Sequence, residues 1–129
     1  MKNVKWELEV NGERMGVDAK TIRNELDRLR SEHSGKIFTL ISPTNNAMIV
    51  GLKDNIGILD FIPGDDKPPY YHSVREKHNE THEFELFFAG GEATEIPWNY
   101  CIDYVDIIIR VGEFMETDAL PKSGIWEED

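Results

Sequence analysis

The sequence predicts an α+β fold: a mostly antiparallel sheet made of a hairpin, a meander, a second hairpin and a short C-terminal strand, combined with two amphipathic helices. Short segments that alternate apolar and polar residues, separated by turn residues, predict the strands. Two longer segments repeat apolar residues at helical spacing and predict the helices. The chain contains no internal repeat and no linker, so we expect a single domain over residues 1–129.

The first part of the chain predicts a hairpin followed by a helix. Apolar and charged side chains alternate over residues 5–10, as they do in a half-buried strand. Asn11 and Gly12 then supply a two-residue hairpin turn, because both tolerate positive φ. Asp18 is the expected N-cap of a helix that runs to about Glu32.

The middle of the chain predicts a meander and a long loop. Strand-like runs cover residues 36–42, 47–52 and 56–62. The turns between them are too short for parallel crossovers, which favours antiparallel pairing. Residues 63–82 lack periodicity and are expected to form one long surface loop, a kind of segment that often carries function.

The last part predicts the second hairpin, the second helix and a final strand. Residues 83–89 and 93–96 are strands on either side of a Gly-Gly turn, and Asp103 caps the helix. We expect the apolar side of this helix to contain Tyr104, Ile107, Ile108, Val111, Phe114 and Met115, and its polar side Asp106, Arg110, Glu113 and Thr117. A run of β-branched residues leaves a strand as the alternative. Residues 124–127 form the final strand.

The net charge of −11 is concentrated in one part of the sequence. Residues 1–75 hold 11 acidic and 11 basic groups, whereas residues 76–129 hold 14 acidic and 3 basic groups. This asymmetry argues against nucleic acid as a direct ligand, which needs a basic face. It fits a basic protein partner, although solubility alone would also explain it.

Several function classes are disfavoured by the composition. No apolar run is long enough to cross a membrane and no apolar signal core opens the chain, so we expect a cytoplasmic protein without a membrane partner. The single cysteine, Cys101, excludes an internal disulfide and a multi-cysteine metal site. We expect it to be an inert, partly buried thiol.

The histidines give only a weak metal signal. His78 and His82 lie four residues apart and could bind a metal if their segment were helical. His78 and Glu80 match the H-x-E half of a zinc-deaminase motif, but its P-C-x-x-C half is missing. We therefore predict no metal site, no cofactor and no enzymatic activity. A small metal-binding protein or enzyme that uses His72, His78 and His82 is an alternative.

The C-terminal third also carries a recognisable pattern. A strand enters a glycine turn, a return strand ends near a proline, a helix closes with a Glu-Phe pair, and another proline precedes a Trp-Glu strand. The residues that carry these features are Gly90, Gly91, Pro97, Glu113, Phe114, Pro121, Trp126 and Glu127. The pattern resembles immunity protein family 1 of bacterial polymorphic toxin systems, whose N-terminal element order also matches. The glycine usual after the helix is replaced here by Asp118.

The resemblance implies a non-enzymatic antitoxin that neutralises a cognate toxin domain encoded by a neighbouring gene. Such toxins are often nucleic-acid-targeting enzymes, such as deaminases or nucleases, and an acidic inhibitor would suit their basic grooves. We expect aromatic anchors with surrounding carboxylates at the contact: Tyr70, Tyr71, Trp98, Tyr100, Asp65, Asp66, Glu92 and Glu95. Trp126 is expected to be largely buried and to hold the fold. A generic acidic adaptor domain is a further alternative.

Overall fold

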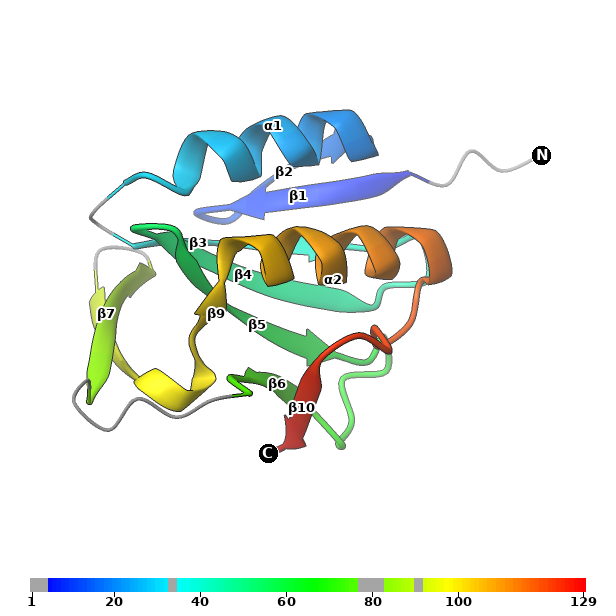
Figure 1. Cartoon of the computed structure of the whole chain (residues 1–129). Coiled ribbons are helices and arrows are strands. Elements are labelled where there is room, and N and C mark those ends of the chain that lie inside the picture. The colour runs from blue at the N-terminus through cyan, green and yellow to red at the C-terminus, as the bar shows by residue number, and fades with distance from the viewer. Residues whose placement is uncertain (1–4, 33–34, 77–82, 90–91) are drawn as a thin grey trace.

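The computed structural model describes residues 5–32, 35–76, 83–89 and 92–129, and it confirms the α+β class (Figure 1). Within these ranges the strands are β1 (Trp6–Val10), β2 (Glu13–Val17), β3 (Lys36–Ile41), β4 (Ala47–Lys53), β5 (Ile56–Ile62), β6 (Tyr71–Val74), β7 (Phe84–Ala89), β8 (Glu92–Pro97), β9 (Ile102–Asp103) and β10 (Ile125–Glu128). The α-helices are α1 (Ala19–Leu29) and α2 (Tyr104–Thr117), and η1 (Trp98–Tyr100) is a 3-10 helix.

The strands form one sheet in which nearly all neighbours are antiparallel. Its order is β10-β6-β5-β4-β3-β1-β2, and β9 pairs with β5. The exception is β7, which lies parallel to β3 through the pair Lys36 and Phe88. Strand β8 pairs with β7 and with no other strand that the structure describes. The predicted N-terminal hairpin, meander and second hairpin are confirmed, and the final strand closes the edge beside β6.

Local turn chemistry explains why the chain reverses where it does. Asn11 and Gly12 have φ of 52° and 84°, the left-handed values that a two-residue hairpin turn requires. Asp54 and Asn55, between β4 and β5, have φ of 47° and 62°. Asparagine and aspartate tolerate this region better than other non-glycine residues, so the sequence selects these turns locally.

Both helices cover the same face of the sheet, and the main core lies between them and the strands (Figure 1). The predicted N-cap Asp18 accepts a hydrogen bond from the Thr21 backbone N–H at 2.8 Å, which confirms where α1 begins. The buried core residues are Leu8, Ile22, Leu26, Leu29, Phe38, Leu40, Met48, Val50, Leu52, Leu59, Phe61, Ile102, Tyr104, Ile107, Val111 and Phe114. The run of three isoleucines at residues 107–109 lies within α2, so the predicted helix is confirmed and the alternative of a strand is not.

The end of α2 shows how the chain accommodates Asp118 in place of a glycine. Asp118 has φ 53° and is the helix C-cap, with its N–H bonded to the Phe114 carbonyl. Its carboxylate accepts hydrogen bonds from the Thr44 hydroxyl at 2.5 Å and from Asn46 Nδ2 at 3.2 Å. These contacts to the β3–β4 turn offset the strain of a left-handed non-glycine residue and tie α2 to the meander.

A second, smaller core lies on the opposite face of the sheet. Ile58, Phe87 and Cys101 are buried there, and the β7–β8 hairpin together with η1 covers them. Phe87 is the largest of the three and is fully buried. A Cβ at Gly51 of β4 would lie only 3.0 Å from the Phe87 ring, so glycine lets the hairpin approach the sheet closely.

Three predictions about individual segments need correction. Residues 63–82 do not form one uninterrupted loop, because residues 71–74 are strand β6; residues 77–82 of that prediction lie outside the described residues. Arg110, predicted on the polar side of α2, is only 3% exposed. Trp126 is half-buried rather than largely buried: it packs on the edge of the main core, with the Arg110 guanidinium 5.2 Å from the centre of its ring.

Candidate functional site

The β7–β8 hairpin presents apolar side chains to solvent. Phe84, Leu86 and Phe88 alternate along β7 and are 42%, 37% and 37% exposed. Glu95 and Pro97 on β8 pair with Leu86 and Phe84, and cross-strand partners point to the same side of a sheet. We call the set Phe84, Leu86, Phe88, Ala93, Glu95 and Pro97 the hairpin face.

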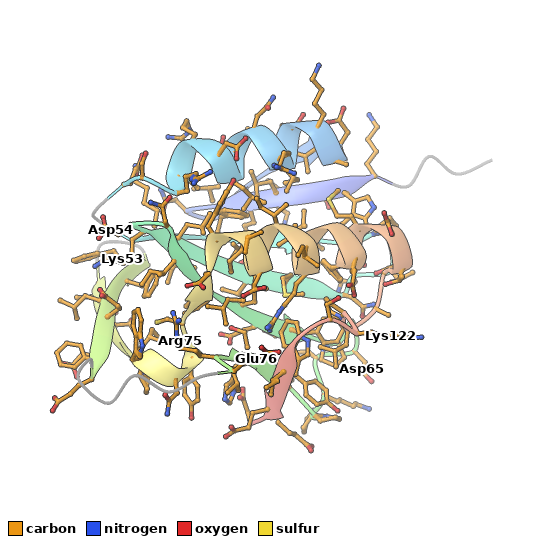
Figure 2. The ribbon with its side chains drawn as sticks, in the orientation of Figure 1. Lys53, Asp54, Asp65, Arg75, Glu76 and Lys122 are labelled. Atoms are coloured by element: carbon orange, nitrogen blue, oxygen red, sulfur yellow. The ribbon has the colours of Figure 1, made fainter. Side chains whose placement is uncertain are left out.

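The hairpin face is exposed because β7 is apolar on both sides and only one side meets the sheet. The alternate side chain Phe87 fills the second core, which fixes the orientation of the strand. Lys53 of β4 lies beside β7 (Figure 2), where its Nζ donates to the Leu86 carbonyl at 3.2 Å and pairs with Glu85 at 3.0 Å. These contacts leave the side chains of Phe84, Leu86 and Phe88 on the outward side of the hairpin.

A carboxylate lies among the apolar side chains, and others lie nearby. Glu95 lies on the hairpin face itself. Glu83 and Glu92 are exposed at the starts of the two strands, and Glu92 pairs with Ala89 on the other side of the hairpin. Aromatic and aliphatic side chains surrounded by acidic groups form a surface that suits a protein partner with a basic rim. Of the predicted contact residues, Glu95 lies on this surface and Glu92 lies at the start of the same strand, with its side chain on the other side.

The other predicted contact residues are not gathered here. Asp65 and Asp66 are exposed in the β5–β6 connection, and Figure 2 shows Asp65 on the side of the molecule away from β7. Tyr70 lies in the same connection, and its hydroxyl donates to the Asp66 carbonyl at 2.7 Å. The structure thus separates this group from Glu92 and Glu95.

The remaining predicted anchors are half-buried rings engaged within the domain. Tyr71 packs against the main core, and Trp98 packs against the second core with the Arg75 guanidinium 4.1 Å from its ring centre. Tyr100 lies against the His72 imidazole, with 4.2 Å between the ring centres. None of these three rings has the exposure of Phe84 or Phe88.

Sequence reasoning missed the exposed anchors on β7, although the segment FELFF carries a signal. A strand with one solvated face has polar residues at every second position. In this segment apolar residues fall on both faces, with Phe84, Leu86 and Phe88 on one and Phe87 on the other. Only one face of such a strand can pack on the sheet. The apolar residues of the other face are then either covered by another segment or exposed to solvent.

The residues of the family-like pattern have mainly structural positions. Phe114 is fully buried and meets Trp6 and Phe61 edge to face, with ring centres 5.0 and 5.9 Å away. Pro121 is buried before β10, whereas Glu127 is exposed with its Oε1 3.9 Å from His72 Nε2. Gly90 and Gly91 lie outside the described residues, so the turn they were predicted to form is not described.

Among the described residues, the chemistry-bearing groups form no metal cluster. No set of three His, Cys, Asp or Glu side chains is arranged to hold a metal ion in this part of the chain. His78 and His82 fall in the range that the structure leaves undescribed. Cys101 is fully buried, and burial, followed by the nearby Glu85, raises the pKa of its thiol to about 12.

No protein-family model matches the chain, and no curated protein matches it. Within the described ranges, neither α-helix has the length and apolar content that crossing a bilayer would require.

Proposed function

We propose that this protein is an antitoxin of the immunity-protein type, which binds a cognate toxin domain and blocks it without catalysing a reaction. The observation that carries the proposal is the hairpin face, where Phe84, Leu86 and Phe88 are exposed beside carboxylates. Large apolar side chains on a soluble domain mark interaction sites when they are contiguous. The resemblance of the C-terminal third to immunity protein family 1 supports the same conclusion.

The proposed mechanism is occlusion of a basic substrate-binding groove. An enzyme that attacks nucleic acid, such as a nuclease or deaminase, needs positive charge along its groove. The excess of carboxylates in residues 76–129 would accelerate encounter with such a surface, and the phenyl rings would supply short-range affinity. Protection of a cell needs a dissociation constant near 1 nM, or about −12 kcal/mol. We place this encounter in the cytoplasm.

The test starts from the adjacent genes. Each neighbouring open reading frame that encodes a basic toxin-like C-terminal domain is expressed with and without this protein, and growth and co-purification are scored. We expect one such product to be toxic alone, harmless together with this chain, and co-purified with it. Binding should weaken above about 0.5 M salt, because screening removes the steering charges.

Point variants locate the contact. Leu86→Ser and Phe88→Ser should each lower affinity for the toxin at least tenfold, because they remove exposed apolar contacts. The matched control is Met15→Ser, since Met15 is an exposed apolar residue, 61% accessible, on the distant edge strand β2. All three variants should retain the wild-type melting temperature within a few degrees. Full rescue and unchanged affinity in both hairpin variants would remove the hairpin face from the proposal.

A further inference from the structure

A cavity of about 370 Å³ lies where β5 and β6 meet the end of β8 and η1. Its apolar wall includes Ile58, Ile96 and Pro97. Its polar wall combines Asp60, His72, Tyr100 and Asp129. The shape and lining are those of a pocket that takes a side chain with an apolar stem and a polar end.

The polar wall is held by the sheet rather than by loose loops. Asp60 of β5 and His72 of β6 are register partners, so both side chains lie on the face away from the helices. The buried Ser73 hydroxyl donates to the Tyr100 carbonyl at 3.0 Å and accepts from the Leu59 N–H at 3.2 Å. Tyr100 is thereby fixed against the His72 ring.

The polar groups of the cavity include two carboxylates beside an imidazole. The His72 Nδ1 atom donates a hydrogen bond to the Asp129 carboxylate. The opposite nitrogen, Nε2, is buried and makes no hydrogen bond among the described residues, and Glu127 Oε1 lies 3.9 Å from it. In the same part of the chain the half-buried Asp60 carboxylate makes no hydrogen bond or ion pair.

Two carboxylates call for a ligand that donates hydrogen bonds and carries positive charge. The described residues give no three-ligand metal geometry, and the apolar wall suits methylene groups instead. We propose that this cavity binds the cationic side chain of an arginine or lysine of the basic partner. This inference rests on the proposed function.

The cavity borders the hairpin face at Pro97, while its other β8 residue, Ile96, lies on the opposite side of that strand. Pro97 pairs with Phe84 on that face and also lines the cavity. A partner seated on Phe84 and Leu86 can therefore extend a side chain past Pro97 toward Asp60. The apolar anchors and the half-buried Asp60 carboxylate then act on the same partner surface, which provides both affinity and a defined register.

The first experiment uses small probes on the whole chain. Nα-acetyl-arginine amide and Nα-acetyl-lysine amide are titrated into labelled protein, and NMR shifts of the Ile58 and Ile96 methyl groups and the His72 ring are followed. At least one probe should cause saturable shifts, whereas the neutral citrulline analogue should cause none. Asp60→Asn should weaken binding about tenfold, because the carboxylate charge is lost. Glu13→Gln on the distant strand β2 is the control and should leave binding unchanged.

The second experiment separates this inference from the proposed function. If the toxin co-purifies but the probes cause no saturable shift, and Asp60→Asn leaves toxin affinity unchanged, the cavity proposal is overturned while the proposed function stands. If the probes bind but no neighbouring gene product does, the proposed partner is overturned. Support requires both saturable probe binding and weaker toxin binding by Asp60→Asn, with Glu13→Gln behaving as wild type in each assay.

Discussion

At the scale of single residues, Asp60 is a carboxylate in an unfavourable place. Burial first, and the nearby Asp129 charge second, raise its pKa to about 6, while His72 acts in the opposite direction. Because this pKa is raised, at pH values between 3.8 and about 6 the Asp60 carboxyl keeps its proton in the folded state and loses it in the unfolded state. Ionised Asp60 therefore lowers stability, and a residue that does so without a structural partner is typical of a binding site.

The stability of Asp60→Asn should depend on pH in a definite direction. Well below the ordinary carboxyl pKa of 3.8 the group is neutral in both states, so ionisation of Asp60 no longer separates the stability of the variant from that of the wild type. As pH rises to about 6, the free energy of unfolding of the wild type should fall by roughly 2 kcal/mol, whereas that of the variant should not change through this group. Urea unfolding of both proteins at pH 4 and pH 7 checks this. If the unfolding free energies of the variant and the wild type differ by the same amount at both pH values, ionisation of Asp60 is not the cause of the difference.

Residue identities explain which single positions were predictable. Asn11, Gly12 and Asp18 act through their own backbone neighbourhoods, so their roles could be predicted from adjacent residues. Arg110 could not be placed in this way, because β10 buries it: its Nη1 donates to the Ile125 carbonyl at 3.2 Å. A Cβ at Gly124, which has φ 79°, would lie 2.0 Å from the same guanidinium.

At the scale of elements, β10 links α2 to the sheet edge through Trp126. Its indole packs on the edge of the main core, and its Nε1 donates to the Ser123 carbonyl at 3.2 Å. Because the ring is only half-buried, Trp126→Ala should lower the free energy of unfolding by about 2 kcal/mol, less than for a fully buried tryptophan. The neighbouring Ile125→Ala, at an exposed position, should cost under about 0.5 kcal/mol. Chemical denaturation measures both, and equal losses would contradict the packing described for Trp126.

Elements with strong local signals were predicted, and elements defined by distant partners were not. The meander strands carry long apolar runs between short turns, and both helices have clear apolar faces. Strand β6 is short and mixes Tyr71, His72 and Ser73, so its pattern is not that of a strand. It becomes one by pairing with β5 on one side and with the remote β10 on the other. The cavity beside β6 could not be predicted from the sequence either, because residues from four separate segments line it.

At the scale of the whole molecule, charge and topology determine which surfaces are exposed and acidic. The acidic excess of residues 76–129 is evident from composition, and the hairpin face lies in the same part of the sequence. Composition could not show which aromatic rings are exposed. That depends on β7 packing through Phe87, which leaves Phe84 and Phe88 in solvent while Trp98 and Tyr100 are partly covered.

The attachment of the β7–β8 hairpin has a consequence for its dynamics. Residues 47–52 of strand β4 are paired on both sides, whereas β7 joins β3 through one register pair among the described residues, that of Lys36 and Phe88. Amides of β7 and β8 should therefore exchange with deuterium through local opening, orders of magnitude faster than those of β4. A bound toxin should slow that exchange; unchanged rates in the complex would contradict contact at this hairpin. The proposed recognition surface thus sits on a hairpin with little backbone pairing to the rest of the sheet, and a bound partner would restrain its opening.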